Sequence, residues 1–194
     1  KVGSPRHEAM LRRALAPIGL PILGAVYRDS KLETPSRHLG LVQANERDDL
    51  EAFLDYSAGI ANNSIDIDLL LSLFKPTLKS SGNPEILPPP AQSIAIASEQ
   101  AFAFAYPHLL SAWQKAGAEL SFFSPLADQA PAASDLVILP GGYPELHAGK
   151  LANNQTFITG MQQAKAVYGE CGGYMTLGEG LIDADGKRHK MLGL

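Results

Sequence analysis

Cysteine is almost absent from this sequence, because Cys171 is the only one among 194 residues. A single cysteine cannot form an intrachain disulfide, and it cannot build a metal cluster held by several thiolates. Without a disulfide framework, a cytoplasmic location is the default expectation. The one thiol is therefore a candidate for chemistry rather than for cross-linking.

Excess positive charge and long apolar runs are also missing. The formal net charge is −4, whereas a nucleic-acid-binding protein normally presents a basic face. The best apolar candidate, residues 19–26, contains Pro21 and is much shorter than the roughly 18 residues that cross a bilayer. No apolar signal-peptide segment follows the first residues. We expect neither nucleic acid nor a membrane as a partner.

What is present supports a folded α/β protein, since hydrophobic residues make up 45% of the chain. Apolar spacing in the first half predicts a helix at 5–15, a buried parallel-type strand at 20–26, and helices at 46–58 and 64–74. Ser64 is the expected N-cap of the last of these helices.

Proline, serine and glycine then accumulate at 75–90, which ends in the run Pro88-Pro89-Pro90. This composition is typical of a semi-rigid linker. We predict a first domain at 1–80, a linker at 81–90 and a second domain at 91–194.

The second half alternates strands with helices. The expected elements are strands at 93–97, 119–123, 135–139 and 166–170, and helices from Pro107 to Gly117 and at 154–164. Short connections between alternating elements indicate a mostly parallel sheet. The predicted fold class is therefore α/β, with two mostly parallel-sheet units.

The fourth strand of the second half runs straight into Cys171. Gly169 and Gly173 flank the cysteine at −2 and +2, which is the spacing of a nucleophile elbow between a strand and a helix. Such a turn strains the nucleophile, leaves no room for side chains at the flanking positions, and places the sulfur at a helix N-terminus that favours thiolate. We predict that Cys171 is a nucleophile; the alternative is a buried core cysteine.

A second glycine-rich segment, Pro140-Gly141-Gly142, also follows a strand and should reach the same sheet edge. The backbone N–H groups of Gly142 and Gly172 would then form an oxyanion hole for a tetrahedral intermediate. The alternative is a plain β-turn.

A thiol-based acyl-transfer enzyme also needs a base, usually histidine. Of the five histidines, only His189 follows Cys171, and its polar surroundings indicate a solvated hairpin turn. We expect His108 and His147 to be surface or capping residues. The base is therefore predicted to be missing from this chain.

At this point two motifs resemble a known family. Gly169–Met175 (GECGGYM) and Leu139–Ala148 (LPGGYPELHA) are similar to the cobyrinic acid a,c-diamide synthase family, and most similar to its hydrogenobyrinic acid form. Segments of the first half, such as Pro35–Leu41 (PSRHLGL), resemble the end of the family's ATP-binding domain. The resemblance covers nearly the whole chain.

The resemblance implies an ATP-dependent, glutamine-hydrolysing amidoligase that amidates the a and c carboxylates of a corrinoid in cobalamin biosynthesis. It implies that 1–80 is the C-terminal part of a dethiobiotin-synthetase-like ATP-binding domain. It implies that 91–194 is a class I glutamine amidotransferase domain of flavodoxin-like fold, cut before its catalytic histidine. The implied cofactors are ATP and Mg²⁺, bound mainly outside this chain, and the implied partners are glutamine and a corrinoid polycarboxylate.

Some residues are assigned to these ligands. Gly141, Tyr143 and Tyr174 are expected at the glutamine pocket, and Arg28 near ATP. Two residues of a polar loop, Arg37 and His38, are expected to contact the corrinoid or a phosphate. Glu170 is expected to have a structural role, hydrogen-bonding neighbouring loop amides. No metal site is expected within the chain.

The sequence has no Gly-x-x-x-x-Gly-Lys-[Ser/Thr] phosphate loop. Because the phosphate loop and the base are both missing, we expect the isolated chain to be inactive. As a separate expectation, the intact enzyme forms a homodimer. Three alternatives remain: a stand-alone α/β cysteine hydrolase, a non-catalytic binding module, and a sister amidotransferase of the cobyric acid synthase type.

Overall fold

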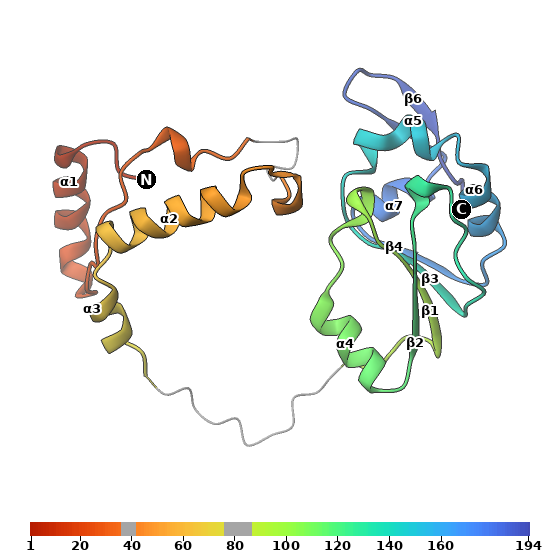
Figure 1. Cartoon of the computed structure of the whole chain (residues 1–194), viewed down its shortest axis with the longest axis horizontal. Coiled ribbons are helices and arrows are strands. Elements are labelled where there is room, and N and C mark those ends of the chain that lie inside the picture. The colour runs from red at the N-terminus through yellow and green to blue at the C-terminus, as the bar shows by residue number, and fades with distance from the viewer. Residues whose placement is uncertain (36–41, 76–86) are drawn as a thin grey trace. The chain divides into compact units, whose positions relative to one another are not determined.

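The computed structural model describes residues 1–35, 42–75 and 87–194, and the chain divides into two compact units (Figure 1). Unit 1 comprises residues 1–81 and unit 2 comprises residues 82–194. Arg37 and His38, together with the first part of the expected linker, lie outside the described residues.

Unit 1 is built from helices. Its α-helices are α1 (Pro5–Leu15), α2 (Leu50–Ser64) and α3 (Ile67–Ser72). The expected helix at 5–15 is confirmed, with Pro5 in its first turn and the Ser4 side chain accepting a hydrogen bond from the backbone N–H of His7 at 3.2 Å. The expected N-cap at Ser64 is wrong. Ser64 ends α2, and the Asp66 carboxylate caps α3 by accepting from the N–H of Leu69 at 2.9 Å.

The strand expected at 20–26 is not formed. This backbone is paired on both sides, but each pairing is a single bridge: Val2 with Tyr27 and Gly24 with Ile65. The segments that pair with this backbone are too short to extend the bridges into strands. Val2 is followed by the N-cap of α1 at Ser4, and Ile65 lies between α2 and α3. The expectation of a parallel sheet in the first half is therefore wrong for the described residues of unit 1.

Unit 2 contains a four-stranded parallel sheet. Its strands are β1 (Ser93–Ala97), β2 (Glu119–Phe123), β3 (Leu136–Leu139) and β4 (Val167–Gly169), in the order β2-β1-β3-β4. All the pairings are parallel. The predicted strands are confirmed to within two residues at each end. The carboxyl ends of β3 and β4, where the two glycine motifs begin, lie side by side at one edge of the sheet.

Helices cover both faces of this sheet (Figure 1). On one face, α4 (Pro107–Lys115) packs its Trp113 against Ile94 and Ile96. The other face carries the larger core, covered by α5 (Ala148–Leu151), α6 (Gln155–Gln162), α7 (Gly172–Leu177) and the hairpin of β5 (Gly180–Ile182) and β6 (Arg188–Lys190). Alternate side chains of each strand thus enter different cores.

The part of the chain that the structure describes holds no helix that is both long and apolar enough to span a bilayer.

Candidate active site

Cys171 lies in the turn between β4 and α7, directly before the first residue of the helix. Its backbone has φ 50° and ψ −118°, so a residue with a Cβ is held in a region that normally costs about 1–3 kcal/mol. The expected strained elbow is present. The Cys171 side chain is exposed, although Gly172 and Gly173 after it are buried. The alternative of a buried core cysteine is therefore wrong.

The elbow depends on glycine at both flanking positions, two residues before and two residues after the cysteine. A Cβ on Gly173 would lie 1.9 Å from the carbonyl oxygen of Leu139 at the end of β3. A Cβ on Gly169 would lie 2.8 Å from the carbonyl carbon of Gly173. The turn is thus closed so tightly against β3 that side chains at −2 and +2 are excluded, as the spacing predicted.

The Pro140-Gly141-Gly142 segment lies against this elbow. A Cβ on Gly141 would be 3.3 Å from the Cβ of Cys171, and a Cβ on Gly172 would be 2.8 Å from the carbonyl oxygen of Gly142. Both Gly141 and Gly142 are buried, and the Gly141 carbonyl accepts a hydrogen bond from the N–H of Phe104 at 2.9 Å. Two loops that are distant in sequence therefore meet at the cysteine.

The remaining expected ligand residues lie in different surroundings. Tyr143 is 2% exposed, and its ring packs edge-on against Phe104 with centroids 5.4 Å apart. Tyr174 is 71% exposed on α7, three residues after the cysteine. Arg28 is exposed and belongs to unit 1. Tyr143 is thus enclosed by other residues, whereas Tyr174 is accessible from solvent.

Glu170 makes contacts that its expected role did not include. Its carboxylate accepts a hydrogen bond from the Tyr168 hydroxyl at 3.4 Å, rather than from loop amides. The charge of Glu170, followed by hydrogen bonding to its carboxylate, raises the pKa of Tyr106 above its ordinary value. Tyr168 and Glu170 are two residues apart on an extended segment and so share a face, which is the sequence signal for this pair. Nothing in the sequence pattern pointed to Tyr106.

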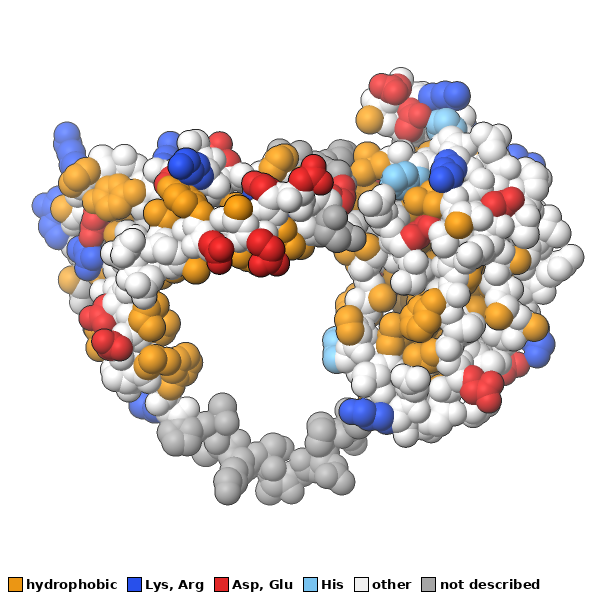
Figure 2. All heavy atoms as spheres, in the orientation of Figure 1, with side chains coloured by type: hydrophobic (Ala, Val, Ile, Leu, Met, Phe, Trp, Pro, Cys, Tyr) orange, Lys and Arg blue, Asp and Glu red, His pale blue; other side chains and the backbone are white. Residues whose placement is uncertain are grey.

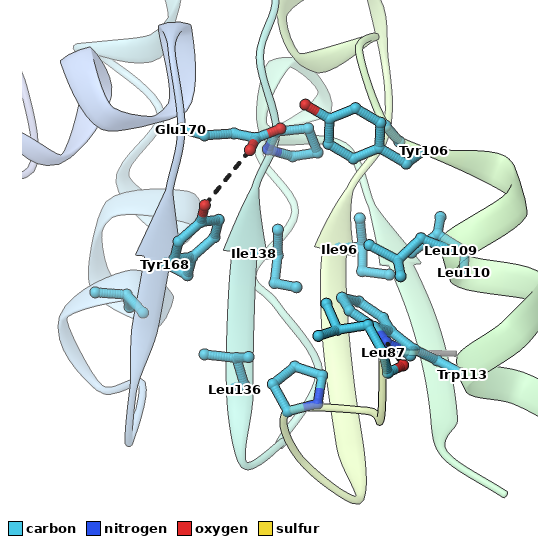
Figure 3. Close-up of a pocket in the computed structure, with 14 residues that line it drawn as sticks. Leu87, Ile96, Tyr106, Leu109, Leu110, Trp113, Leu136, Ile138, Tyr168 and Glu170 are labelled. Atoms are coloured by element: carbon cyan, nitrogen blue, oxygen red, sulfur yellow. Dashed lines mark hydrogen bonds between the residues drawn. The ribbon is translucent and has the colours of Figure 1, made fainter. Parts of the chain in front are cut away.

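These three side chains line one end of a pocket on the α4 face of the sheet (Figure 3). The pocket has a volume of about 430 Å³, and most of its wall is apolar, including Ile96, Trp113 and Ile138. Figure 2 shows hydrophobic side chains gathered on this face of unit 2 beside α4.

His189 is placed differently from expectation. Its ring Nε2 lies 2.6 Å from Asp183 Oδ2, with the His189 side chain only 10% exposed. The hydrogen bond to His189 is the largest cause that lowers the pKa of Asp183, followed by the backbone N–H of Lys187. The solvated turn histidine is thus a partly buried member of a hairpin pair. Among the described residues, no hydrogen bond or ion pair joins a histidine to Cys171.

Residues 93–194 match the family of CobB/CobQ-like glutamine amidotransferase domains. The chain belongs to this family. The matched amidotransferase domain contains both loops of the site, the elbow cysteine and the Tyr106–Glu170–Tyr168 cluster.

Curated relatives match the whole length of this chain. It is 52% identical over 201 residues to hydrogenobyrinate a,c-diamide synthase of Brucella anthropi, covering 100% of this chain and 46% of the relative. Proteins of the same name from Mesorhizobium japonicum and Rhizobium meliloti are 52% and 51% identical over 199 residues, again over 100% of this chain and 45% and 46% of the relative. The chain thus spans about half the length of these relatives. No solved structure matches it.

The described residues do not by themselves form a metal cage. They contain no group of three His, Cys, Asp or Glu side chains that could hold a metal ion, and the sequence has no phosphate loop. No residue among them is therefore assigned to Mg²⁺.

Proposed function

We propose that this chain is the glutaminase-bearing part of a hydrogenobyrinate a,c-diamide synthase. In this proposal the enzyme hydrolyses glutamine at Cys171 and uses the ammonia for ATP-dependent amidation of the a and c carboxylates of a corrinoid, in cobalamin biosynthesis. The observation that carries it is the strained, exposed Cys171 beside the Gly141–Gly142 loop in a glutamine amidotransferase domain. The names of the relatives support the corrinoid substrate.

The proposed reaction begins when the Cys171 sulfur bonds to the amide carbon of glutamine. The carbonyl oxygen then takes on negative charge, which the N–H groups of Gly142 and Gly172 would stabilise as an oxyanion hole. The C–N bond breaks, ammonia leaves with one added proton, and a glutamyl thioester remains. Water then cleaves the thioester, which releases glutamate and restores the thiol.

Support for the oxyanion hole is geometric. The two loops approach closely enough that a Cβ on Gly172 would collide with the Gly142 carbonyl oxygen at 2.8 Å and with Pro144 Cδ at 2.5 Å. Backbone can come this close only where side chains are missing. We infer that the glycines are present so that backbone N–H groups, rather than side chains, surround the reacting carbonyl.

Several finer assignments belong to the same proposal. Gly141, Tyr143 and Tyr174 would line the glutamine pocket. Arg28, Arg37 and His38 would serve ATP, phosphate or corrinoid. Unit 2 would have the flavodoxin-like fold of class I amidotransferases, unit 1 would be the end of a dethiobiotin-synthetase-like domain, and the enzyme would form a homodimer.

The test compares two nitrogen sources in the full-length enzyme. Cys171→Ser should abolish glutamine-dependent amidation of hydrogenobyrinate, because the nucleophile is lost, and should leave ammonia-dependent amidation nearly unchanged. The measurement is the rate of corrinoid amide formation with glutamine or with an ammonium salt. Equal loss of both activities in a folded variant would contradict the role of Cys171. Amidation of cobyric acid precursors in place of hydrogenobyrinate would favour the sister enzyme type.

A further inference from the structure

Glu170 is the one charged residue among the fourteen described residues that line the apolar pocket. It follows β4 directly, so its carboxylate lies at the carboxyl edge of the sheet, where Pro140 of the glycine-rich loop also lines the pocket. Figure 3 shows its side chain extending across this end of the pocket between Tyr168 and Tyr106. A charge at the edge of an apolar cavity is costly unless it is paired.

The contacts of this carboxylate orient it but leave it without a counter-ion. Its neighbours are two tyrosine hydroxyls, of which Tyr168 donates at 3.4 Å. Across residues 1–35, 42–75 and 87–194, no lysine, arginine or histidine forms an ion pair with Glu170. Both tyrosines are about half exposed, at 50% and 52%. The arrangement therefore holds a negative charge in place while one side stays open to a ligand.

Glu170 also directly precedes the nucleophile in the chain. Glu170 and Cys171 are consecutive, which separates their Cα atoms by about 3.8 Å. The Tyr106 hydroxyl is influenced by both, because the charge on Cys171 also contributes to the raised pKa of Tyr106. Pro140, which lines this end of the pocket, is followed directly by Gly141, where an added Cβ would lie 3.3 Å from the Cβ of Cys171. The thiol and the Glu170 end of the pocket therefore lie at the same edge of the sheet.

Free glutamine has the complementary chemistry. Its amide carbon is joined by two methylenes to a carbon that carries a primary ammonium group and a carboxylate, and of these two groups only the ammonium complements the charge of Glu170. An acidic ligand would be repelled by Glu170, which argues against a corrinoid carboxylate at this end of the pocket. An ammonium group instead forms charge-assisted hydrogen bonds to a carboxylate.

We propose that Glu170 is a specificity residue, whose carboxylate binds the α-ammonium group of glutamine while Cys171 attacks the amide carbon. This inference rests on the proposed glutaminase function. Tyr106 and Tyr168 act as positioning residues, because their hydroxyls fix the carboxylate in the orientation that the ammonium group meets.

The experiment uses two chloroketones on the full-length enzyme: the chloroketone analogue of glutamine, and the same molecule without its α-amino group. In each, the Cys171 sulfur bonds to the terminal carbon as chloride leaves, and the thiol proton passes to solvent. The second-order rate of labelling at Cys171 is followed by mass spectrometry. The wild type should react faster with the α-amino reagent.

Glu170→Gln should slow labelling by the α-amino reagent by about tenfold to a hundredfold, the range expected for a charged hydrogen bond, and should barely change labelling by the other reagent. Glu119→Gln is the matched control. It removes the same charge from an exposed position at the start of β2, and it should leave both rates unchanged.

A second variant tests the same inference if Glu170→Gln fails to fold. Tyr106→Phe combined with Tyr168→Phe changes only half-exposed side chains, keeps the carboxylate, and should reduce the preference for the α-amino reagent by a smaller factor. Loss of the preference with an unchanged thermal unfolding midpoint supports the inference.

Other outcomes would overturn it. An unchanged preference in folded Glu170→Gln, or an equal loss of both rates, removes Glu170 from ammonium recognition and leaves the glutaminase proposal standing. Failure of both chloroketones to label wild-type Cys171, when iodoacetamide labels it, would instead refute the glutaminase function itself.

Discussion

Replacing Gly173 with alanine tests whether the close approach of the elbow to β3 is needed for glutamine-dependent activity. The added Cβ would lie 1.9 Å from the Leu139 carbonyl oxygen, 2.6 Å from its carbon and 2.8 Å from the Pro140 carbonyl oxygen. Contacts under 3.0 Å are essentially never seen for a real Cβ, so α7 or the end of β3 must move by about 1 Å. All three atoms are backbone, so no side-chain rotation can relieve the collision.

Two effects should follow from that movement. Overpacking of this kind typically lowers the free energy of unfolding by about 1–3 kcal/mol. A misplacement of about 1 Å in a catalytic constellation typically costs about 10²-fold in rate. Gly173→Ala should therefore lose about 10²-fold or more of its glutamine-dependent activity, while its ammonia-dependent activity stays close to that of the wild type.

The assay measures both activities in the full-length enzyme, together with urea unfolding. Gly178→Ala is the matched control in the same helix region, since its Cβ would meet only the Met175 carbonyl oxygen at 3.5 Å, an ordinary contact. Full glutamine-dependent activity in folded Gly173→Ala would refute the reasoning, because it would mean that the loops can separate without affecting the thiol.

Two further predictions concern stability. Gly59→Ala should raise the free energy of unfolding of unit 1 by about 0.5–1 kcal/mol, because Gly59 lies inside α2 and a Cβ there meets nothing within 4 Å; an unchanged or lower thermal midpoint would contradict this. Asp183→Asn should destabilise the hairpin at neutral pH, because His189 lowers the pKa of Asp183 in the folded state. A lowered carboxyl pKa adds to the free energy of unfolding at any pH above the ordinary aspartate pKa of about 3.9, and this addition is lost as the pH falls through the pKa of the folded state. The free energies of unfolding of wild type and variant, measured in urea, should therefore converge in acid.

The elbow could be predicted from the sequence because its determinants are local. Gly169, Cys171 and Gly173 follow an apolar strand, and that spacing alone requires a sharp turn in which side chains at −2 and +2 would collide. The same holds for α1, where Ser4 and Pro5 define the first turn within a few residues. The strands of unit 2 could also be predicted from the sequence, because buried parallel strands are continuous apolar runs.

Features that depend on distant partners were not predictable in this way. The apolar run at 20–26 looks like a buried strand, yet a strand needs neighbours of matching length, and its neighbours form helices after one bridge each. His189 looked solvated because its sequence neighbours are polar, whereas the hairpin brings Asp183 to 2.6 Å from its ring.

The sequence by itself determined that Cys171 would lie in a strained turn at the end of a strand, since neighbouring glycines and backbone sterics decide this. Only the tertiary structure decided what surrounds the thiol. Parallel pairing of β3 with β4 brings Gly141 against Cys171, and the packing of α4 on the sheet brings Tyr106 to Glu170. These contacts join segments tens of residues apart, and their distances depend on the register and packing of the whole sheet, which no local spacing encodes.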